Sequence, residues 1–229
     1  MENIKDEITN IAINMGAKKI GFAKLTDYIP EKYSHLDTGI SFIVRLSDQI
    51  IDDIEGIPTY TYYHHYRTVN YLIDQIAFKI SDYLQDKGYL SMPIPASQSV
   101  KTKNEKYSGI FQHRTVATLS GNGWIGKNAS LITKEFGPRV RLGTVLTNWK
   151  TQYNSPIKES KCGDCRICVS KCPALALKGN NWSQGLLRKE IVDVVKCSNH
   201  MSNHYKNIGR GSVCGVCISS CPVGNERIR

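Results

Sequence analysis

The chain has 229 residues, of which 41% are hydrophobic and 22% are charged, and its formal net charge is +10. This length allows one substantial hydrophobic core plus a small appended module. The sequence contains no apolar run of about 18 residues, and Met1–Met15 mixes charged with apolar residues, which argues against a membrane-spanning helix and a signal peptide. We therefore expect a cytoplasmic protein with no membrane association. The basic charge favours nucleic-acid binding only weakly, because the lysines and arginines are scattered.

The N-terminal part of the chain begins with a predicted helix and two short strands. The helix is indicated by apolar residues at helical spacing, which are Ile4, Ile8, Ile11 and Met15. Gly16 is placed to end it. Strands are predicted at Lys19–Ala23 and Ile40–Leu46.

The strongest helical pattern lies within Thr59–Gly88, and Gly88 ends it. Its apolar face consists of Val69, Leu72, Ile73, Ile76, Ala77, Ile80, Tyr83 and Leu84. A strand is predicted next at Tyr89–Ile94, followed by a short helix at about Gln112–Leu119.

Two further strands are predicted at Ser130–Thr133 and Val140–Thr147, around the Gly137–Pro138 turn. One more helix is expected near Leu186–Val195. Strands that alternate with helices predict an α/β or α+β layer domain. We place this domain at residues 1–152 and a smaller ferredoxin-like module at residues 153–229, where cysteine, glycine and short loops dominate.

All eight cysteines lie in the last third of the chain, in two related sets. The first set reads Cys162-x2-Cys165-x2-Cys168-x3-Cys172-Pro173, and the second reads Cys214-x2-Cys217-x3-Cys221-Pro222, with Cys197 alone upstream. In two-cluster ferredoxins, the cysteine that precedes the proline binds the other cluster. The predicted ligands of one 4Fe–4S cluster are therefore Cys162, Cys165, Cys168 and Cys221. Those of the second are Cys172, Cys197, Cys214 and Cys217.

Zinc and disulfides are the alternatives for these cysteines. A four-cysteine zinc ribbon uses two separate Cys-x2-Cys knuckles, whereas the triple run found here is typical of iron–sulfur clusters. Disulfides are rare in reducing compartments. The pattern thus favours two clusters, which by themselves specify electron transfer and no particular reaction.

A glycine-rich segment, Gly121–Asn128, reads Gly-Asn-Gly-Trp-Ile-Gly-Lys-Asn and has the letters of a dinucleotide-binding turn. Such a turn requires a strand before the glycines and a helix after them. Here a helical pattern precedes the glycines and strand-like residues follow, so we reject the nucleotide interpretation. The segment is interpreted instead as a turn that lets the backbone approach something flat or large.

The order of these motifs resembles that of the epoxyqueuosine reductase family, whose members are iron–sulfur and cobalamin enzymes related in architecture to reductive dehalogenases. The resemblance runs from about Lys18 to Arg229 and is carried by His113-Arg114, the glycine-rich turn, Leu142–Thr147 and the cysteine sets. It implies an N-terminal domain that cradles a cobalamin and an adjacent cluster that reduces the cobalt. The residues that it implies along the corrin are Gly123, Trp124, Gly126, Lys127 and Asn128.

The sequence departs from the family at its proposed proton donor, an aspartate in a Val-Asp-Thr segment. The corresponding segment here is Val100-Lys101-Thr102. Lys101 and Tyr107 are the two weak candidates for a donor, because a lone tyrosine or lysine is more often an ordinary surface or core residue. The sequence also ends at Arg229 without the helical-repeat extension that many members use on tRNA. Both departures predict a changed substrate or loss of the original reaction.

We predict an iron–sulfur oxidoreductase that passes electrons through two 4Fe–4S clusters to a bound cobalamin. Its substrate would be a small organic molecule or a nucleoside, and its electron donor a ferredoxin or flavodoxin. The alternative is an electron-transfer or cofactor-activating protein with no substrate of its own. Binding to tRNA without catalysis rests on net charge alone and is the least favoured hypothesis.

Overall fold

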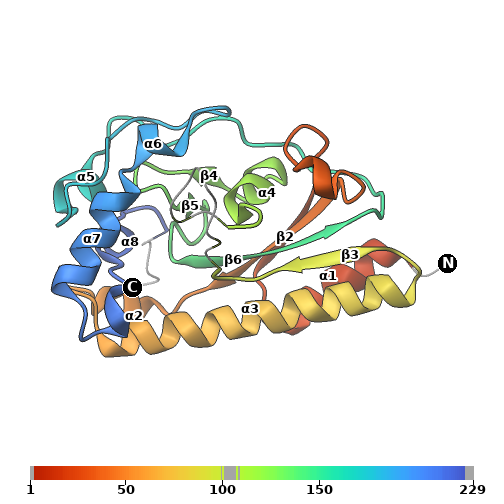
Figure 1. Cartoon of the computed structure of the whole chain (residues 1–229), viewed down its shortest axis with the longest axis horizontal. Helices are drawn as coiled ribbons and strands as arrows, with labels where there is room; N and C mark the ends of the chain where they lie inside the picture. Colours follow the sequence, from red (N-terminus) through yellow and green to blue (C-terminus); the bar gives the residue numbers. More distant parts are fainter. Residues whose placement is uncertain (1–2, 99, 101–106, 108, 225–229) are drawn as a thin grey trace. The chain divides into compact units, whose positions relative to one another are not determined.

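The computed structural model describes residues 3–98, 100, 107 and 109–224. Its regular elements in chain order are α1 (Ile4–Asn14), β1 (Lys19–Lys24), η1 (Glu31–Tyr33), β2 (Thr38–Arg45), α2 (Asp48–Asp52), α3 (Tyr60–Asp86), β3 (Ser91–Ile94), α4 (His113–Leu119), β4 (Trp124–Ile125), β5 (Leu131–Ile132), β6 (Val140–Thr147), α5 (Ile167–Lys171), α6 (Arg188–Ile191), α7 (Val194–His204), η2 (Gly209–Gly211) and α8 (Val216–Ser219). Figure 1 labels these elements. None of the described helices is both long enough and apolar enough to cross a membrane.

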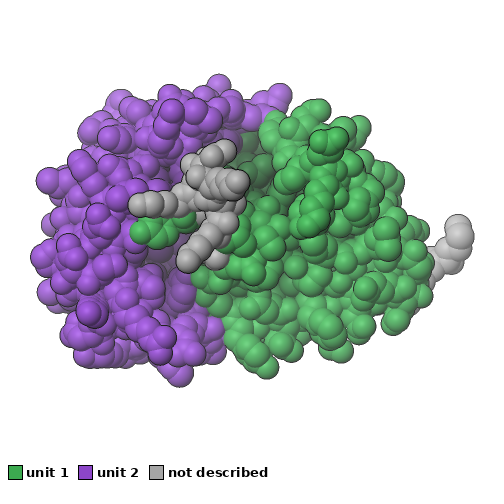
Figure 2. Space-filling view, viewed as in Figure 1, with its two compact units in different colours: residues 1–45, 69–122, 141–157 green, residues 46–68, 123–140, 158–229 purple. Residues whose placement is uncertain are grey.

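The chain divides into two compact units, which Figure 2 distinguishes by colour. The first unit comprises Met1–Arg45, Val69–Asn122 and Arg141–Ile157, and the second comprises Leu46–Thr68, Gly123–Val140 and Lys158–Arg229. We predicted two domains that are each continuous in sequence, with the boundary between residues 152 and 153. Each compact unit instead consists of three separate segments. The segment after residue 152 stays with the first unit because Asn154 exchanges two hydrogen bonds with Phe22 of β1. The division into a corrinoid domain and a cluster module stays a prediction.

The first unit is built on a four-stranded sheet with the order β1-β2-β6-β3. Strands β1 and β2 are antiparallel, as are β3 and β6. Helix α4 packs on one face, where Gly21 and Gly39 leave room for it: a Cβ at either position would overlap Ser120 or Val116. Helix α1 lies on the opposite face, with the Lys5 ammonium 5.1 Å from the centre of the Phe22 ring. The unit is therefore a mixed α/β layer structure.

Local sequence explains the two long helices of this part of the chain. The Asn3 side chain caps α1 by accepting a hydrogen bond from the backbone N–H of Lys5, and Asp6 lies in the first turn. Helix α3 buries one apolar stripe, and Gly88 follows its end with a φ of 82°, a conformation that glycine adopts freely. The buried residues of this stripe are Val69, Ile73, Ile76, Ala77, Ile80 and Leu84.

The second unit contains shorter elements, and one of them corrects a prediction. The single helix expected near Leu186–Val195 is two helices, α6 and α7, because the chain is extended at Val192. Val192 bridges Leu177, and the Asp193 side chain then caps α7 by accepting hydrogen bonds from Val195 and Lys196. The apolar spacing across this region gave no sign of the break.

Candidate iron–sulfur centre

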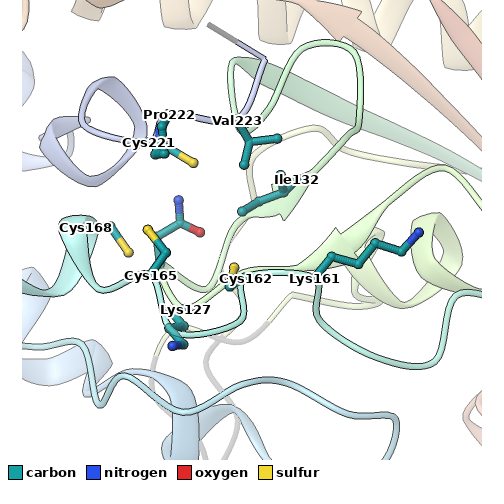
Figure 3. A pocket seen from close by; sticks show the side chains of 10 residues that line it. Lys127, Ile132, Lys161, Cys162, Cys165, Cys168, Cys221, Pro222 and Val223 are labelled. Carbon is teal, nitrogen blue, oxygen red and sulfur yellow. The ribbon is translucent and has the colours of Figure 1, made fainter.

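Four cysteines surround one cavity in the second unit. The cavity has a volume of about 70 Å³, and Figure 3 shows the sulfurs of Cys162, Cys165, Cys168 and Cys221 around it. This is far more space than the roughly 10–15 Å³ that one water molecule requires. These four residues are the set that the spacing predicted for one cluster.

The first two of these cysteines are brought together by a tight turn. The N–H of Cys165 donates to the carbonyl of Cys162 at 3.1 Å, and Gly163 between them has a φ of 53°. This left-handed conformation favours glycine. Cys168 lies on α5, Cys221 lies two residues after the end of α8, and these two short helices contact each other.

The other four cysteines form a neighbouring group in the same unit. Cys172 ends α5, Cys197 lies on α7, Cys214 precedes α8 and Cys217 lies on α8. Burial raises the pKa of Cys217, and the neighbouring thiols of Cys214, Cys197 and Cys172 raise it further, each by more than Cys168 of the first group does. Two pairs of cysteines are separated by three residues, Cys168 with Cys172 and Cys217 with Cys221. In each pair, one cysteine belongs to the first group and the other to the second.

Burial controls the protonation of the free thiols. It raises the pKa of Cys168 to about 11, with Cys221, Cys162 and Cys165 adding to the shift. The pKa of Cys214 is likewise raised to about 11, mainly by burial and in part by the nearby Cys197 and Cys172. Because a bound metal requires thiolates, filling these sites would release protons.

The arrangement differs from a mononuclear zinc site, in which four ligands surround one ion. Among the residues that the structure describes, no three His, Cys, Asp or Glu side chains come close enough to hold a single ion. All eight cysteines are free, so none is paired in a disulfide. The cysteines form two groups of four thiols, and a cavity lies between the four thiols of the first group. Such a set of donors fits iron–sulfur clusters.

The glycine-rich turn forms a hairpin in which β4 and β5 are antiparallel. A Cβ at Gly123 would overlap the carbonyl of Ile132, and one at Gly126 would overlap the Ile132 side chain. These two glycines therefore allow the hairpin to close on itself. Contact between them and a corrin stays a prediction.

The other residues predicted along the corrin have different surroundings. Lys127 and Asn128 line the cysteine cavity. The Asn128 amide donates to the carbonyl of Cys217 at 3.1 Å, so it links this turn to the second cysteine group. Trp124 is buried, and its indole N–H has no hydrogen-bond partner among the described residues.

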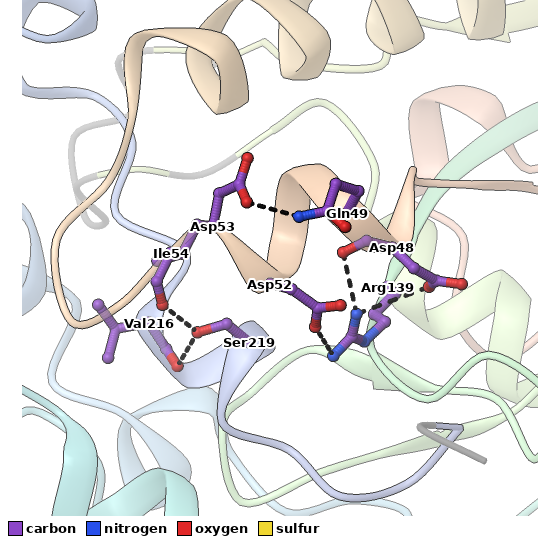
Figure 4. Close-up of polar contacts among 8 residues, drawn as sticks. All are labelled: Asp48, Gln49, Asp52, Asp53, Ile54, Arg139, Val216 and Ser219. Atoms are coloured by element: carbon purple, nitrogen blue, oxygen red, sulfur yellow. Dashed lines mark hydrogen bonds and ion pairs between the residues drawn. The ribbon is translucent and has the colours of Figure 1, made fainter. Parts of the chain in front are cut away.

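A buried arginine, which the sequence did not single out, supports the second unit (Figure 4). Arg139 is 1% exposed, and its guanidinium pairs with the carboxylate of Asp52 at 2.9 Å and with that of Asp48 at 3.6 Å. The Ser219 hydroxyl of α8 donates to the carbonyl of Ile54 at 3.1 Å. The Arg139 pairs join the segment before β6 to α2, and the Ser219 hydrogen bond joins α8, which carries Cys217, to the segment that follows α2. No sequence pattern distinguished Arg139 from the surface arginines.

The two candidate proton donors are not brought into a described site. Lys101 lies outside the described residues. Tyr107 is 42% exposed and has a positive φ of 63°. Their assignment as catalytic residues stays a prediction.

A histidine of the first unit is held as the neutral form. The His113 Nε2 lies 3.1 Å from the Pro95 carbonyl and its Nδ1 lies 2.9 Å from the Thr144 hydroxyl. A carbonyl only accepts, so Nε2 carries the proton and Nδ1 accepts from Thr144. Burial lowers the pKa of His113 to about 4, with Arg141 and Arg114 contributing in the same direction.

Comparison with known proteins places these features in a family context. Residues 161–224 match the model of a 4Fe–4S double cluster binding domain. An epoxyqueuosine reductase from Atelocyanobacterium thalassa is 28% identical, over 97% of this chain and 80% of that protein. One from Staphylococcus aureus is 33% identical over 54% of this chain, but the match spans 32% of the relative.

Solved structures show the same fold at low sequence identity. A catabolic reductive dehalogenase in complex with 3-bromo-4-hydroxybenzoic acid has a TM-score of 0.74 and 17% identity over 96% of this chain and 31% of its own. An epoxyqueuosine reductase bound to an epoxyqueuosine-modified tRNA stem loop has a TM-score of 0.63 and 17% identity over 98% of this chain and 67% of its own. The chain thus spans about a third of the dehalogenase and two thirds of the reductase.

The predicted resemblance is therefore confirmed in both sequence and fold, and the cluster domain covers all eight cysteines. The chain is thus similar over most of its length to epoxyqueuosine reductases, and residues 161–224 match a domain that binds two 4Fe–4S clusters.

Proposed function

We propose that this protein passes electrons through its two clusters to a bound corrinoid, which reduces a modified nucleoside. The observation that carries the proposal is the sorting of the cysteines into two adjacent groups of four. One cluster would be held by Cys162, Cys165, Cys168 and Cys221. The other would be held by Cys172, Cys197, Cys214 and Cys217. Two clusters held by adjacent cysteine groups would form a path for single electrons.

A corrinoid would supply the strongly reducing chemistry that protein side chains lack. Two observations support its presence. The dehalogenase fold to which this chain is similar occurs in a structure described as suggesting a mechanism for B12-dependent dehalogenation. The buried indole N–H of Trp124 has no partner among the described residues, so it offers a donor to a bound group. The protein's own part is to bind and orient this group and to exclude water from it.

The substrate class follows from the relatives. Their name specifies reduction of epoxyqueuosine, and one of them was solved with a tRNA stem loop that contains this nucleoside. The change from aspartate to Lys101 at the family's proposed donor position leaves room for a different oxygenated nucleoside or small molecule. The electron donor would be a ferredoxin or a flavodoxin.

The first experiment measures cofactors. Anaerobically reconstituted protein should contain about eight iron and eight acid-labile sulfide per chain, as two cubanes require. The same protein, mixed with cobalamin, should keep the corrin through gel filtration. Intact clusters without corrin retention would favour the alternative of an electron-transfer protein with no substrate of its own.

The second experiment measures turnover. The loaded protein is mixed with a chemical reductant and with an RNA stem loop that carries epoxyqueuosine, and the nucleosides are separated by mass. Conversion to the deoxygenated nucleoside is expected, and its absence with both cofactors bound would contradict the proposed substrate. A parallel assay with a halogenated phenol distinguishes a dehalogenase-type substrate.

A further inference from the structure

One buried cation, Lys127, lies beside the cysteines. The side chain of Lys127 is 4% exposed, and its ammonium donates a 2.6 Å hydrogen bond to the carbonyl of Gly163. Among the described residues, no carboxylate lies within ion-pair distance of this ammonium. Lys127 also lines the cavity formed by Cys162, Cys165, Cys168 and Cys221.

A buried positive charge is unfavourable unless a negative group compensates it. One neutral carbonyl does not provide that compensation. A cluster in the cavity would compensate the lysine charge. The negative charge of four thiolates exceeds the positive charge of a cubane core, so the complete centre is an anion. The lysine and the cluster would thus compensate each other.

The hydrogen bond of Lys127 also reaches the loop that supplies two of the ligands. Gly163 lies between Cys162 and Cys165, and its carbonyl accepts a second hydrogen bond from the Asn181 amide at 3.1 Å. Lys127 and Asn181 therefore both hold the same loop, but only Lys127 brings a charge. Variants of these two residues therefore separate the effect of holding the Gly163 loop in place from the effect of a positive charge near the cluster.

We propose that Lys127 is the buried counter-ion of the cluster held by Cys162, Cys165, Cys168 and Cys221, and that it sets the reduction potential of this cluster. The inference rests on the proposed function, since it requires a cluster at this site. When the cluster gains one electron from a reductant, its negative charge grows, and a nearby fixed positive charge favours the reduced form. Lys127 is therefore a positioning residue for electron transfer and has no part in bond breaking.

The test compares Lys127→Gln with two control variants. Lys161→Gln removes a lysine that lines the same cavity but is exposed and extends away from the sulfurs in Figure 3. Asn181→Ala removes the second hydrogen bond to Gly163 without changing charge. The midpoint potentials of the clusters are measured by redox titration monitored by electron paramagnetic resonance.

For Lys127→Gln, one of the two clusters should become at least tenfold harder to reduce, which is about 59 mV for a one-electron couple. The other cluster should change less, because it is farther away. Lys161→Gln and Asn181→Ala should shift neither potential by a comparable amount. An unchanged potential in Lys127→Gln, or an equal shift in Asn181→Ala, would overturn the proposal.

A second readout uses the protein without metal. Because Lys127 is buried without a negative partner there, Lys127→Met should unfold at the same or a higher temperature than the metal-free wild type, although it retains its cluster less well. A lower unfolding temperature of the metal-free variant would show that Lys127 has a structural role, which overturns the proposal. Failure of the wild type to bind iron and sulfide would instead contradict the iron–sulfur function itself.

Discussion

The first unit contains a four-stranded sheet and most of the long helix α3. The second contains a hairpin whose strands have two residues each, and helices of four to eleven residues. Of the twelve described glycines with positive φ, nine lie in the second unit. Such residues allow sharp turns but lose much conformational freedom on folding. Regular secondary structure and apolar packing stabilise the first unit. The second unit has more backbone turns, and we expect its stability to depend more on what the cysteines bind.

The largest expected effect comes from removing metal. Without iron, the buried thiols lose the ligand bonds that join the turns, so amide hydrogen exchange in residues 158–224 should accelerate by orders of magnitude. The sheet of the first unit should keep its protection. Hydrogen exchange with mass detection, before and after chelation, measures both.

Reconstitution with iron and sulfide is the control for this experiment, since it should restore the slow exchange. Equal loss of protection in both units would show that their difference in stability is not set by metal.

The next largest effect tests how the ligands are divided within the second unit. Cys197→Ala should lower iron and sulfide from about eight to about four per chain, because only one cluster loses a ligand. Cys221→Ala should cause the same loss but leave the other cluster. Chemical assay gives the amounts, and paramagnetic resonance of the reduced protein shows which signal remains. Loss of both clusters in Cys197→Ala would contradict the division.

A third variant measures how much protein contacts alone stabilise the second unit. Asp52→Asn leaves the guanidinium of Arg139 with Asp48 as its remaining carboxylate, and breaking a buried ion pair costs up to about 3–5 kcal/mol. Denaturant unfolding of the metal-loaded protein should show this loss. Asp53→Asn is the matched control, since Asp53 is exposed and its carboxylate accepts a hydrogen bond from the Gln49 amide but does not contact Arg139. Equal stability of the two variants would mean that Asp48 alone compensates Arg139.

The smallest effect concerns pH and the first unit. Because the folded protein lowers the pKa of His113 to about 4, His113 binds a proton more readily when unfolded, where its pKa is about 6.5. Its contribution to stability is thus complete above pH 6.5 and is lost as the pH falls toward 4. This loss amounts to about 1–3 kcal/mol after allowance for solvent screening.

Denaturant unfolding at a series of pH values measures this contribution. His113→Gln should flatten the dependence of unfolding free energy on pH between these limits. His35→Gln, which changes an exposed histidine of the same unit, should leave the slope unchanged. A slope that is insensitive to His113 would show that other groups cause the acid sensitivity.

Much of the first unit could be predicted from sequence because its elements follow local periodicity. The predicted strands at Lys19–Ala23, Ile40–Leu46 and Val140–Thr147 are confirmed as β1, β2 and β6. The long helix is confirmed as α3. Local spacing also predicted two groups of four cysteines, since the short loops between ligands fix which thiols are near one another.

Tertiary structure decided what lies around those cysteines. The spacing gave no reason to pair Lys127 with the loop of Gly163, or Arg139 with Asp52, because these partners are distant in sequence. It also gave no reason to join residues 46–68 and 123–140 to the cysteine-rich segment. The local spacing of apolar residues indicates which face of a helix or strand is buried. The compensation of a buried charge depends on groups that only the folded chain brings within a few ångströms, so it has no periodic signature in the sequence.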